Sequence, residues 1–296
     1  MLMGVLLQIT INSLLAGSLY ALIASGFSLL FNVQKFVDLS YGSLYAISAY
    51  VVYFFFTKLN IFFPISIIMA MIISSSIGLL FYTFIYDKLR KKKENRTSLL
   101  LASFGILTLI EGLLLLLFGA SPRSYGFKAQ QGISLFGASI TKTQIGIIFT
   151  SVIILLLLLF LLKKTKLGIA IRAISDNKII ASTIGINFKK ISTITIIIAS
   201  ILASIASISL GLDQGIHHTM GLKAILFGFT SAIIGGIGNV AASMLGGFLL
   251  GIIENFGIVY LPSEFKDAIA YIVLITFLLL RPQGMMGIKT REEVAG

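Results

Sequence analysis

Residues 143–162 read TQIGIIFTSVIILLLLLFLL, a run of twenty residues without a charged side chain. A run of this length carries an α-helix across about 30 Å of hydrocarbon, and it lacks the alternation of a barrel strand. Similar blocks fill the chain, which is 57% hydrophobic and 11% charged over 296 residues, with a mean hydropathy of +1.02. Such a composition has too few polar side chains to cover a water-soluble protein. The sequence therefore predicts an all-α integral membrane protein.

The apolar blocks predict a polytopic bundle of eight or nine transmembrane helices that forms one domain over residues 1–296. The predicted spans are 5–31, 40–57, 61–86, 98–118, 143–162, 191–211, 222–236, 241–259 and 266–281. The span 222–236 is short for a full crossing and runs into the glycine-rich stretch IIGGIGN at 233–239. We therefore expect a glycine-broken or re-entrant segment near 222–240.

This glycine-rich stretch has two interpretations. Irregular backbone at membrane depth persists where protein or a water-filled cavity satisfies its hydrogen bonds, so the stretch is a candidate pathway or gate. Alternatively, the glycines serve close helix packing, which the nearby pattern Gly247-x-x-x-Gly251 favours. The candidate pathway residues here are Gly235, Gly236, Gly238 and Asn239.

Positive charge gathers in three segments, because residues 87–97, 163–190 and 281–296 hold eleven of the twelve net positive charges. Loops rich in Lys and Arg stay on the cytoplasmic side, which predicts an N-terminus outside and a cytoplasmic C-terminus. The loop 119–142 is then outside, although it also nets three positive charges. Since these charges border apolar spans, we expect membrane lipid, and no nucleic acid, as a partner.

The sequence lacks the residues that several kinds of catalytic or binding site require. The chain has no cysteine, which excludes disulfides and thiolate metal sites. No G-x-x-x-x-G-K-[ST] phosphate loop and no G-x-S-x-G nucleophile elbow occurs in it. His217 and His218 are adjacent, and no carboxylate cluster accompanies them. We therefore expect that the chain is not an enzyme and has neither a metal nor a cofactor of its own.

Two carboxylates fall within apolar runs, Glu111 in LTLIEGLLLL and Glu254 in LGIIENFGIV. A charge at membrane depth costs roughly 3 kcal/mol, so such a residue indicates either a pathway or a hydrogen-bonded structural tie. Both interpretations stay open for Glu111, near the middle of its span. The polar Asn255 beside Glu254 favours a structural tie there.

Residues 163–190 form a basic, partly polar strip between two apolar spans, and they are longer than a simple connection needs. The strip predicts a short amphipathic helix with Asp176 as its N-cap and Gly185 as its terminator. Its apolar face consists of Ile179, Ile180, Thr183 and Ile184. On the cytoplasmic side, such a face packs against lipid headgroups, its own bundle or another protein.

Six stretches together resemble the permeases of branched-chain amino acid ABC transporters. They are TKLGIAIRAISDN at 165–177, STIGIN at 182–187, GSLYALIASGFSLLF at 17–31, IIGGIGN at 233–239, LGGFLLGIIE at 245–254 and YLPSEFKDAIAYIVLITFLLLRPQGMMG at 260–287. They cover nearly the whole chain in the family's order, and the opening module is similar to the shorter of the two paired permease paralogues. Ala181-x-x-x-Gly185 also matches the end of the ATPase-docking pattern of many ABC importers, although Ile179 and Ile180 stand where glutamate and alanine are usual.

The resemblance implies the permease subunit of an ATP-driven ABC importer in a bacterial inner membrane. It also implies three kinds of partner: a homologous permease subunit in a heterodimer, two cytoplasmic ATPase subunits that bind ATP and Mg, and an external solute-binding protein. The implied cargo is a branched-chain or related amino acid. The ATPase-coupling residues that it implies are Arg172, Ala173, Asp176, Ala181, Gly185, Ile186 and Asn187.

The chain departs from the family after the first span. Where the family usually has asparagine, an aromatic or aliphatic residue, alanine, histidine and glycine, this chain has Asp38-Leu39-Ser40-Tyr41-Gly42. The resemblance thus marks Asp38, Tyr41 and Gly42, together with Glu111, as candidate pathway or gate residues. It leaves room for another small polar cargo, such as an amide, urea, a sugar or a nucleoside. Alternatively, Asp38 is the N-cap of the second span.

A second class of function remains open beside the ABC permease. In a secondary transporter coupled to protons or sodium, Glu111 or Asp38 would be the titrating or ion-binding group. A channel is disfavoured because no span offers a clear ring of polar or charged pore residues.

Overall fold

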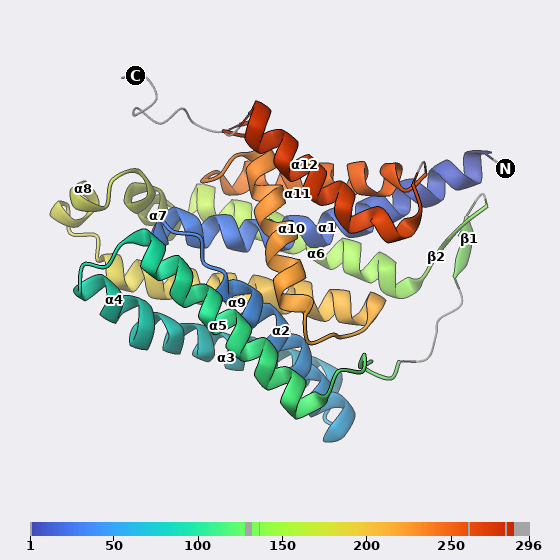
Figure 1. Cartoon of the computed structure of the whole chain (residues 1–296), viewed down its shortest axis with the longest axis horizontal. Helices are drawn as coiled ribbons and strands as arrows, with labels where there is room; N and C mark the ends of the chain where they lie inside the picture. Colours follow the sequence, from blue (N-terminus) through green and yellow to red (C-terminus); the bar gives the residue numbers. More distant parts are fainter. Residues whose placement is uncertain (1, 128–131, 136, 260, 282, 287–296) are drawn as a thin grey trace. The chain divides into compact units, whose positions relative to one another are not determined.

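The structure is a computed structural model that describes residues 2–127, 132–135, 137–259, 261–281 and 283–286. Lys289 and Arg291, which contribute charge to the predicted cytoplasmic tail, lie outside the described residues. The elements, labelled in Figure 1, are α1 (Leu2–Gln34), α2 (Ser40–Val52), η1 (Tyr53–Lys58), α3 (Phe63–Phe81), η2 (Tyr82–Tyr86), α4 (Asp87–Lys91), α5 (Arg96–Phe118), β1 (Ile133–Leu135), β2 (Ala138–Ile140), α6 (Lys142–Lys164), α7 (Lys166–Asp176), α8 (Lys178–Thr183), α9 (Phe188–Gln214), α10 (Met220–Gly235), α11 (Val240–Gly257), η3 (Ser263–Phe265) and α12 (Lys266–Leu280). Strands β1 and β2 pair antiparallel, with Ile133 opposite Ile140.

Helices dominate because a backbone in hydrocarbon must satisfy its own hydrogen bonds. Within the described residues, six helices are long and apolar enough to cross a membrane. They are Met3–Gln34, Phe63–Lys91, Arg96–Phe118, Lys142–Lys164, Phe188–Gln214 and Val240–Gly257. The predicted all-α membrane class is confirmed. The remaining predicted spans, 40–57, 222–236 and 266–281, do not meet this criterion of length and composition, so the total of eight or nine crossings stays a prediction.

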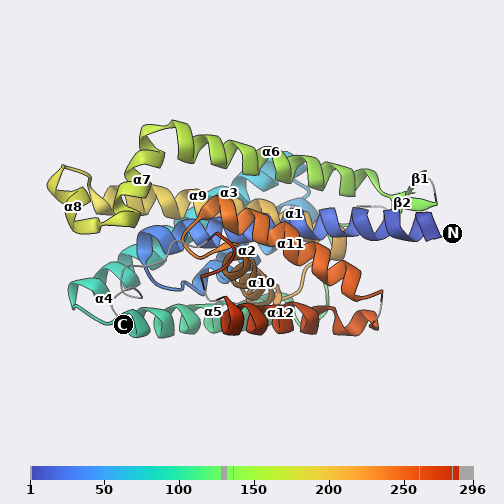
Figure 2. The same ribbon diagram turned by 90° about the horizontal axis from the view of Figure 1, so that it is seen from above.

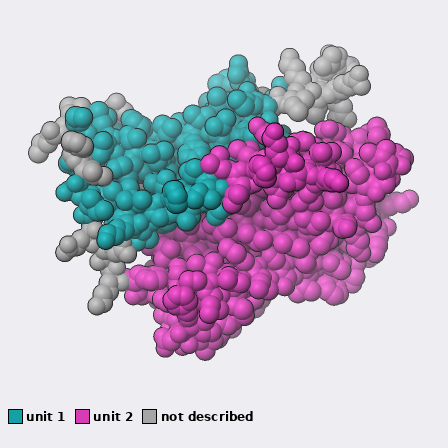
Figure 3. All heavy atoms as spheres, turned by 180° about the vertical axis from the view of Figure 1, so that it is seen from behind, with its two compact units in different colours: residues 1–28, 132–155, 227–296 teal, residues 29–131, 156–226 magenta. Residues whose placement is uncertain are grey.

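The chain divides into two compact units, drawn in different colours in Figure 3. Unit 1 comprises residues 1–28, 132–155 and 227–296, and unit 2 comprises residues 29–131 and 156–226.

In unit 2, helix α2 packs against α3, α5 and α9, and α3 packs against α9. Small side chains allow these helices to approach closely, as is usual in membranes. The hydroxyls of Ser48 and Ser204 are 2.8 Å apart and join α2 to α9. A Cβ at Gly78 of α3 would lie 2.9 Å from the Ser200 hydroxyl of α9. Glycines with positive φ, Gly119 and Gly215, end α5 and α9.

In unit 1, the first part of α1 packs against α11 through glycines. A Cβ at Gly247 would lie 2.4 Å from the Ala21 amide nitrogen, and one at Gly251 would lie 2.5 Å from that of Gly17. Only glycine lets the two backbones come this close. The packing interpretation of Gly247-x-x-x-Gly251 is therefore confirmed for this pair.

The glycine-rich stretch of unit 1 forms the turn between α10 and α11. Helix α10 runs without a break from Met220 to Gly235. Gly236 and Gly238 follow with φ of 125° and 95°, which other residues rarely adopt. The Asn239 side chain accepts a hydrogen bond from the Ala242 amide at 3.1 Å and so caps α11. At sixteen residues α10 is about 24 Å long, and whether it is re-entrant stays a prediction.

Candidate functional sites

The first part of the predicted coupling strip is helix α7, which is fixed to the end of α6. Thr165 caps α7 by accepting a hydrogen bond from the Gly168 amide at 3.2 Å. A Cβ at Gly168 would overlap the carbonyl oxygen of Leu162, so α7 turns tightly against the last turn of α6. Arg172 donates to the same Leu162 oxygen at 2.8 Å. Arg172 therefore satisfies a helix C-terminus, which is a local structural role.

The second part is helix α8, as the strip predicts, but its cap differs. Asp176 ends α7, and the Asn177 side chain accepts from the Ile179 and Ile180 amides at 2.9 and 3.1 Å. The prediction that Asp176 is the N-cap is therefore wrong. Asparagine has a shorter path to these amides because it directly precedes the helix. The carbonyl of Ala173, four residues before Asn177, accepts from the Asn177 amide at 3.1 Å.

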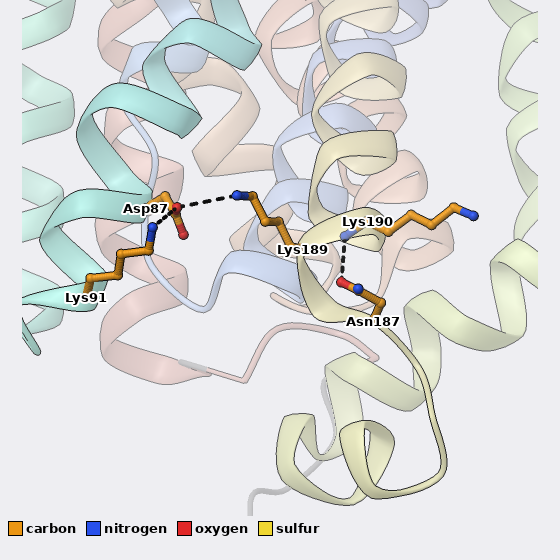
Figure 4. Close-up of polar contacts among 5 residues, drawn as sticks. All are labelled: Asp87, Lys91, Asn187, Lys189 and Lys190. Carbon is orange, nitrogen blue, oxygen red and sulfur yellow. Dashed lines mark hydrogen bonds and ion pairs between the residues drawn. The ribbon is translucent and has the colours of Figure 1, made fainter.

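After α8 the chain turns as predicted. Gly185 adopts φ of 88°, and the Ile186 amide donates to the Ala181 oxygen at 3.0 Å. This positive φ explains glycine at the terminator position. The Asn187 side chain then caps α9 by accepting from the Lys190 amide at 3.1 Å (Figure 4).

Helix α8 has one buried side and one exposed side. Ala181 is buried, whereas Ile179, Ile180 and Ile184 are 75%, 61% and 69% exposed. Exposed isoleucines this close together are unusual on a polar strip and form an apolar surface for lipid headgroups or another protein. The structure thus places the small residue of the docking pattern inside the subunit and the aliphatic residues outside.

The two basic segments of unit 2 meet at one end of it. Asp87 forms ion pairs with Lys91 at 3.0 Å and with Lys189 at 3.7 Å (Figure 4). In Figure 2, α4, α7 and α8 lie at the same end of unit 2. At the far ends of α5 and α9, Arg123 and Ile216 form a backbone bridge of 2.9 and 2.8 Å. Residues 87–97 and 163–190 therefore share one end, and residues 119–127 lie about one span away.

Asp38 lies in a buried polar cluster between α1 and α2. Its Oδ1 accepts from the Ser40 amide at 3.0 Å, from the Ser40 hydroxyl at 2.6 Å and from the Tyr86 hydroxyl at 2.8 Å. Burial raises the pKa of the Asp38 carboxyl, while these hydrogen bonds and the nearby Arg90 charge lower it. The N-cap position of α2 is Leu39, so the alternative that Asp38 is the N-cap is wrong, although Asp38 accepts a hydrogen bond from the Ser40 amide at the start of that helix.

The next residues of this stretch are also buried. Tyr41 is fully buried, and its hydroxyl has no hydrogen-bond partner within the described residues. A Cβ at Gly42 would lie 2.5 Å from the Gly221 oxygen, so α2 and the first turn of α10 touch through their backbones. This contact explains why the glycine persists where the rest of the family pattern is lost.

Glu111 on α5 interacts with the start of α10 in unit 2. Its Oε1 accepts from the Leu222 amide at 3.0 Å, within the first turn of that helix. A carboxylate is favourable at this position because the first amides of a helix lack partners and carry partial positive charge. The structural-tie interpretation of Glu111 therefore has a specific contact.

Glu254 is completely buried in unit 1. The Tyr20 hydroxyl donates to Glu254 Oε2 at 2.6 Å, and Lys266 Nζ lies 3.8 Å from the same oxygen. The structural tie predicted for Glu254 is present. Its partners lie far away in the sequence or on another helix, and no local pattern in the sequence identifies them.

Known proteins are similar to this sequence over nearly its whole length. A family model described as branched-chain amino acid transport system / permease component matches residues 9–278. The chain is 30% identical to the high-affinity branched-chain amino acid transport system permease protein BraD of Pseudomonas aeruginosa, over 97% of this chain and 98% of that protein. It is also 30% identical to the permease protein LivH of the corresponding high-affinity system of Salmonella typhimurium, over 97% of each.

A solved structure shares the fold. PsaBC from Streptococcus pneumoniae, determined in complex with Fab, contains a chain that matches with a TM-score of 0.52 and 12% identity. The match covers 92% of this chain and 91% of that chain.

Proposed function

Because the chain belongs to the family of branched-chain amino acid transport system permease components, we propose that it translocates branched-chain or related amino acids as the permease subunit of an ABC importer. A binding protein outside the membrane would deliver the solute, and partner ATPases would bind ATP and Mg and drive the cycle. The partner permease would be a homologue rather than a second copy. The departure at residues 38–42 keeps an amide, urea, a sugar or a nucleoside as the alternative cargo.

We propose a multi-pass location in a bacterial inner membrane, with eight or nine crossings, the N-terminus outside and the C-terminus cytoplasmic. The meeting of segments 87–97 and 163–190 at one end of unit 2 supports this orientation, because one membrane side then receives both basic loops. The weaker positive charge of 119–142 lies on the other side in this arrangement.

The observation that carries the proposal is the exposed isoleucine face of α8. Three aliphatic side chains on a cytoplasmic helix are unfavourable in water, and their burial in an apolar groove of a partner lowers the free energy. The chain has no phosphate loop, so the ATP-driven step requires another subunit, and we propose that this subunit docks on the isoleucine face of α8. Binding of nucleotide would move that subunit, and α8 would pass the movement to α7 and α9.

The proposal predicts that Ile180→Glu prevents the ATPase from binding. A carboxylate forced into an apolar groove leaves a buried charge, which we expect to lower ATPase copurification at least about tenfold. The matched control is Ser182→Glu, which adds the same charge to an exposed position on the other side of Ala181. The measurement is a pull-down of the tagged chain from mild detergent, followed by assay of solute uptake.

Equal ATPase recovery with Ile180→Glu and with the native chain would contradict docking through α8. Ala181→Glu and Gly185→Arg would be less informative. Ala181 is buried and Gly185 has positive φ, so both changes disturb the fold of the strip itself.

The rival ion-coupled mechanism makes a different prediction for Glu111. A titrating or ion-binding carboxylate would lose its function in Glu111→Gln. We expect instead that this variant keeps ATP-driven uptake within about fivefold, because glutamine retains an acceptor for the Leu222 amide and loses only the charge effect at the helix N-terminus. Uptake into proteoliposomes, with ATP or with an ion gradient alone, measures both. Accumulation driven by an ion gradient without ATPases would establish the rival.

A further inference from the structure

Arg90 lies at a junction between segments that are distant in the sequence. It is on α4, which continues α3 through the π-helical segment η2. Its Nη2 donates to the backbone oxygen of Gln34 at 2.8 Å and to the Gln34 side-chain oxygen at 2.5 Å. Gln34 is the last residue of α1, where carbonyl oxygens lack helix partners and a cation is favourable.

The guanidinium of Arg90 also contacts the coupling strip. It lies 5.3 Å from the ring centroid of Phe188, the first residue of α9. The ammonium of Lys178, the first residue of α8, lies 3.6 Å from the same centroid. Cations are attracted to the faces of aromatic rings. Phe188 therefore connects the start of α8 to Arg90, and both cations restrain its position.

Arg90 is also connected, through Phe36 and Tyr86, to the segment that contains Asp38. Its guanidinium lies 5.8 Å from the Phe36 ring, and that ring packs edge-on against Tyr86 at 5.1 Å. Tyr86 precedes Arg90 by one helical turn, so the two side chains share a face. The Tyr86 hydroxyl donates to Asp38 Oδ1 at 2.8 Å, and its oxygen lies 2.8 Å from the Ser40 hydroxyl oxygen.

Arg90 also has a second terminal nitrogen, Nη1, which is a hydrogen-bond donor. Within the described residues, its Nη1 is buried and has no hydrogen-bond partner. A buried donor without an acceptor is unfavourable, and Asp38 is close enough to interact with the Arg90 charge. The hydrogen bonds from Nη2 to Gln34 thus fix the junction, whereas Nη1 is a donor that would gain an acceptor only in a shifted arrangement.

We propose that Arg90 is the positioning residue that couples the docking strip to the segment 35–42, which comprises the connection after α1 and the first residues of α2. This inference rests on the proposed function and deepens it. When an ATPase displaces α8, Lys178 and Phe188 move with it, and Arg90 transfers the displacement to Gln34, Phe36 and the Asp38 cluster. Segment 35–42 is backbone-packed against the first turn of α10 through Gly42, so the displacement reaches the start of that helix.

The test compares Arg90→Gln with the native chain in the complete reconstituted importer. We expect the ATPases to copurify and hydrolyse ATP as before, while solute transported per ATP hydrolysed falls about tenfold, within the usual range of coupling energies. The matched control is Lys92→Gln, which removes a positive charge from an exposed position two residues away. A purely structural role for Arg90 would lower hydrolysis and transport in proportion and would overturn the inference, as would an unchanged ratio.

A second measurement separates Arg90 from its surroundings. If Arg90 acts through Gln34, the double variant with Gln34→Ala has the same ratio of transport to hydrolysis as Arg90→Gln alone, and additive losses would contradict the inference. Should Arg90→Gln fail to assemble, Arg90→Lys keeps the charge but not the planar guanidinium, and the same ratio is measured on it. Failure of the native chain to bring down an ATPase would instead overturn the proposed function itself.

Discussion

Gly251→Ala is expected to destabilise the folded chain by about 3 kcal/mol, at the upper end of the cost of overpacking a core. The new Cβ would lie 2.5 Å from the nitrogen and 2.6 Å from the Cα of Gly17, and 2.9 Å from the Ser13 oxygen. All three are backbone atoms, so no rotamer change relieves the overlap. The first part of α1 and α11 would have to separate, and every contact along that helix pair would weaken.

The measurement is the fraction of purified chain that stays monodisperse in detergent after heating. The control is Gly146→Ala on α6, where a Cβ meets no atom within 4 Å. Alanine is the better helix former, so this control should be neutral or slightly stabilising. If the two variants have the same midpoint of thermal unfolding, close packing of α1 on α11 is wrong.

Lys266→Met is expected to cost about 3 kcal/mol, because removing the cation that faces a buried carboxylate leaves that charge without its ion-pair partner. Glu254 is completely buried, and Lys266 Nζ lies 3.8 Å from its Oε2. Methionine preserves much of the aliphatic stem but takes the positive charge away. The carboxylate would keep the hydrogen bond from Tyr20 but lose the nearby positive charge.

A double-mutant cycle checks this explanation. In the double variant with Glu254→Gln the buried charge is absent, so we expect it to be more stable than Lys266→Met alone. Tyr20→Phe, which deletes the 2.6 Å hydrogen bond but keeps the ring stacked on Phe227, should be destabilising by itself. If the effects of the first two changes are additive, Lys266 does not act through Glu254.

The sequence was most informative about features that depend on residues close together in the chain. Blocks of apolar residues predicted the helices, since a chain in hydrocarbon has few other ways to satisfy its backbone. Gly247-x-x-x-Gly251 predicted a close helix contact, because the spacing puts both glycines on one face. The Asn177 cap was missed because Asp176 and Asn177 are both good capping residues, and only the end of α7 decides between them.

Contacts between distant segments were not predictable. Arg90 looks like one of six basic residues in a loop-rich stretch, and only the fold brings it against Gln34 and Phe188. The same holds for Glu111, whose partner amide at Leu222 is 111 residues away. Nearly every residue type has the same backbone amide and carbonyl. A sequence pattern therefore does not show which backbone group a given side chain binds.

The pairing of Glu254 with Tyr20 and Lys266 also bears on how the protein is made. The ribosome delivers α11 before α12, so the carboxylate reaches the bilayer twelve residues before the ammonium of Lys266. Entering alone, it would cost roughly 3 kcal/mol at the centre of a span. Tyr20, synthesised more than two hundred residues earlier, is already in place to donate a hydrogen bond to the carboxylate. We therefore expect α11 to leave the insertion machinery together with α12, as one hairpin that docks on α1 at the moment of integration.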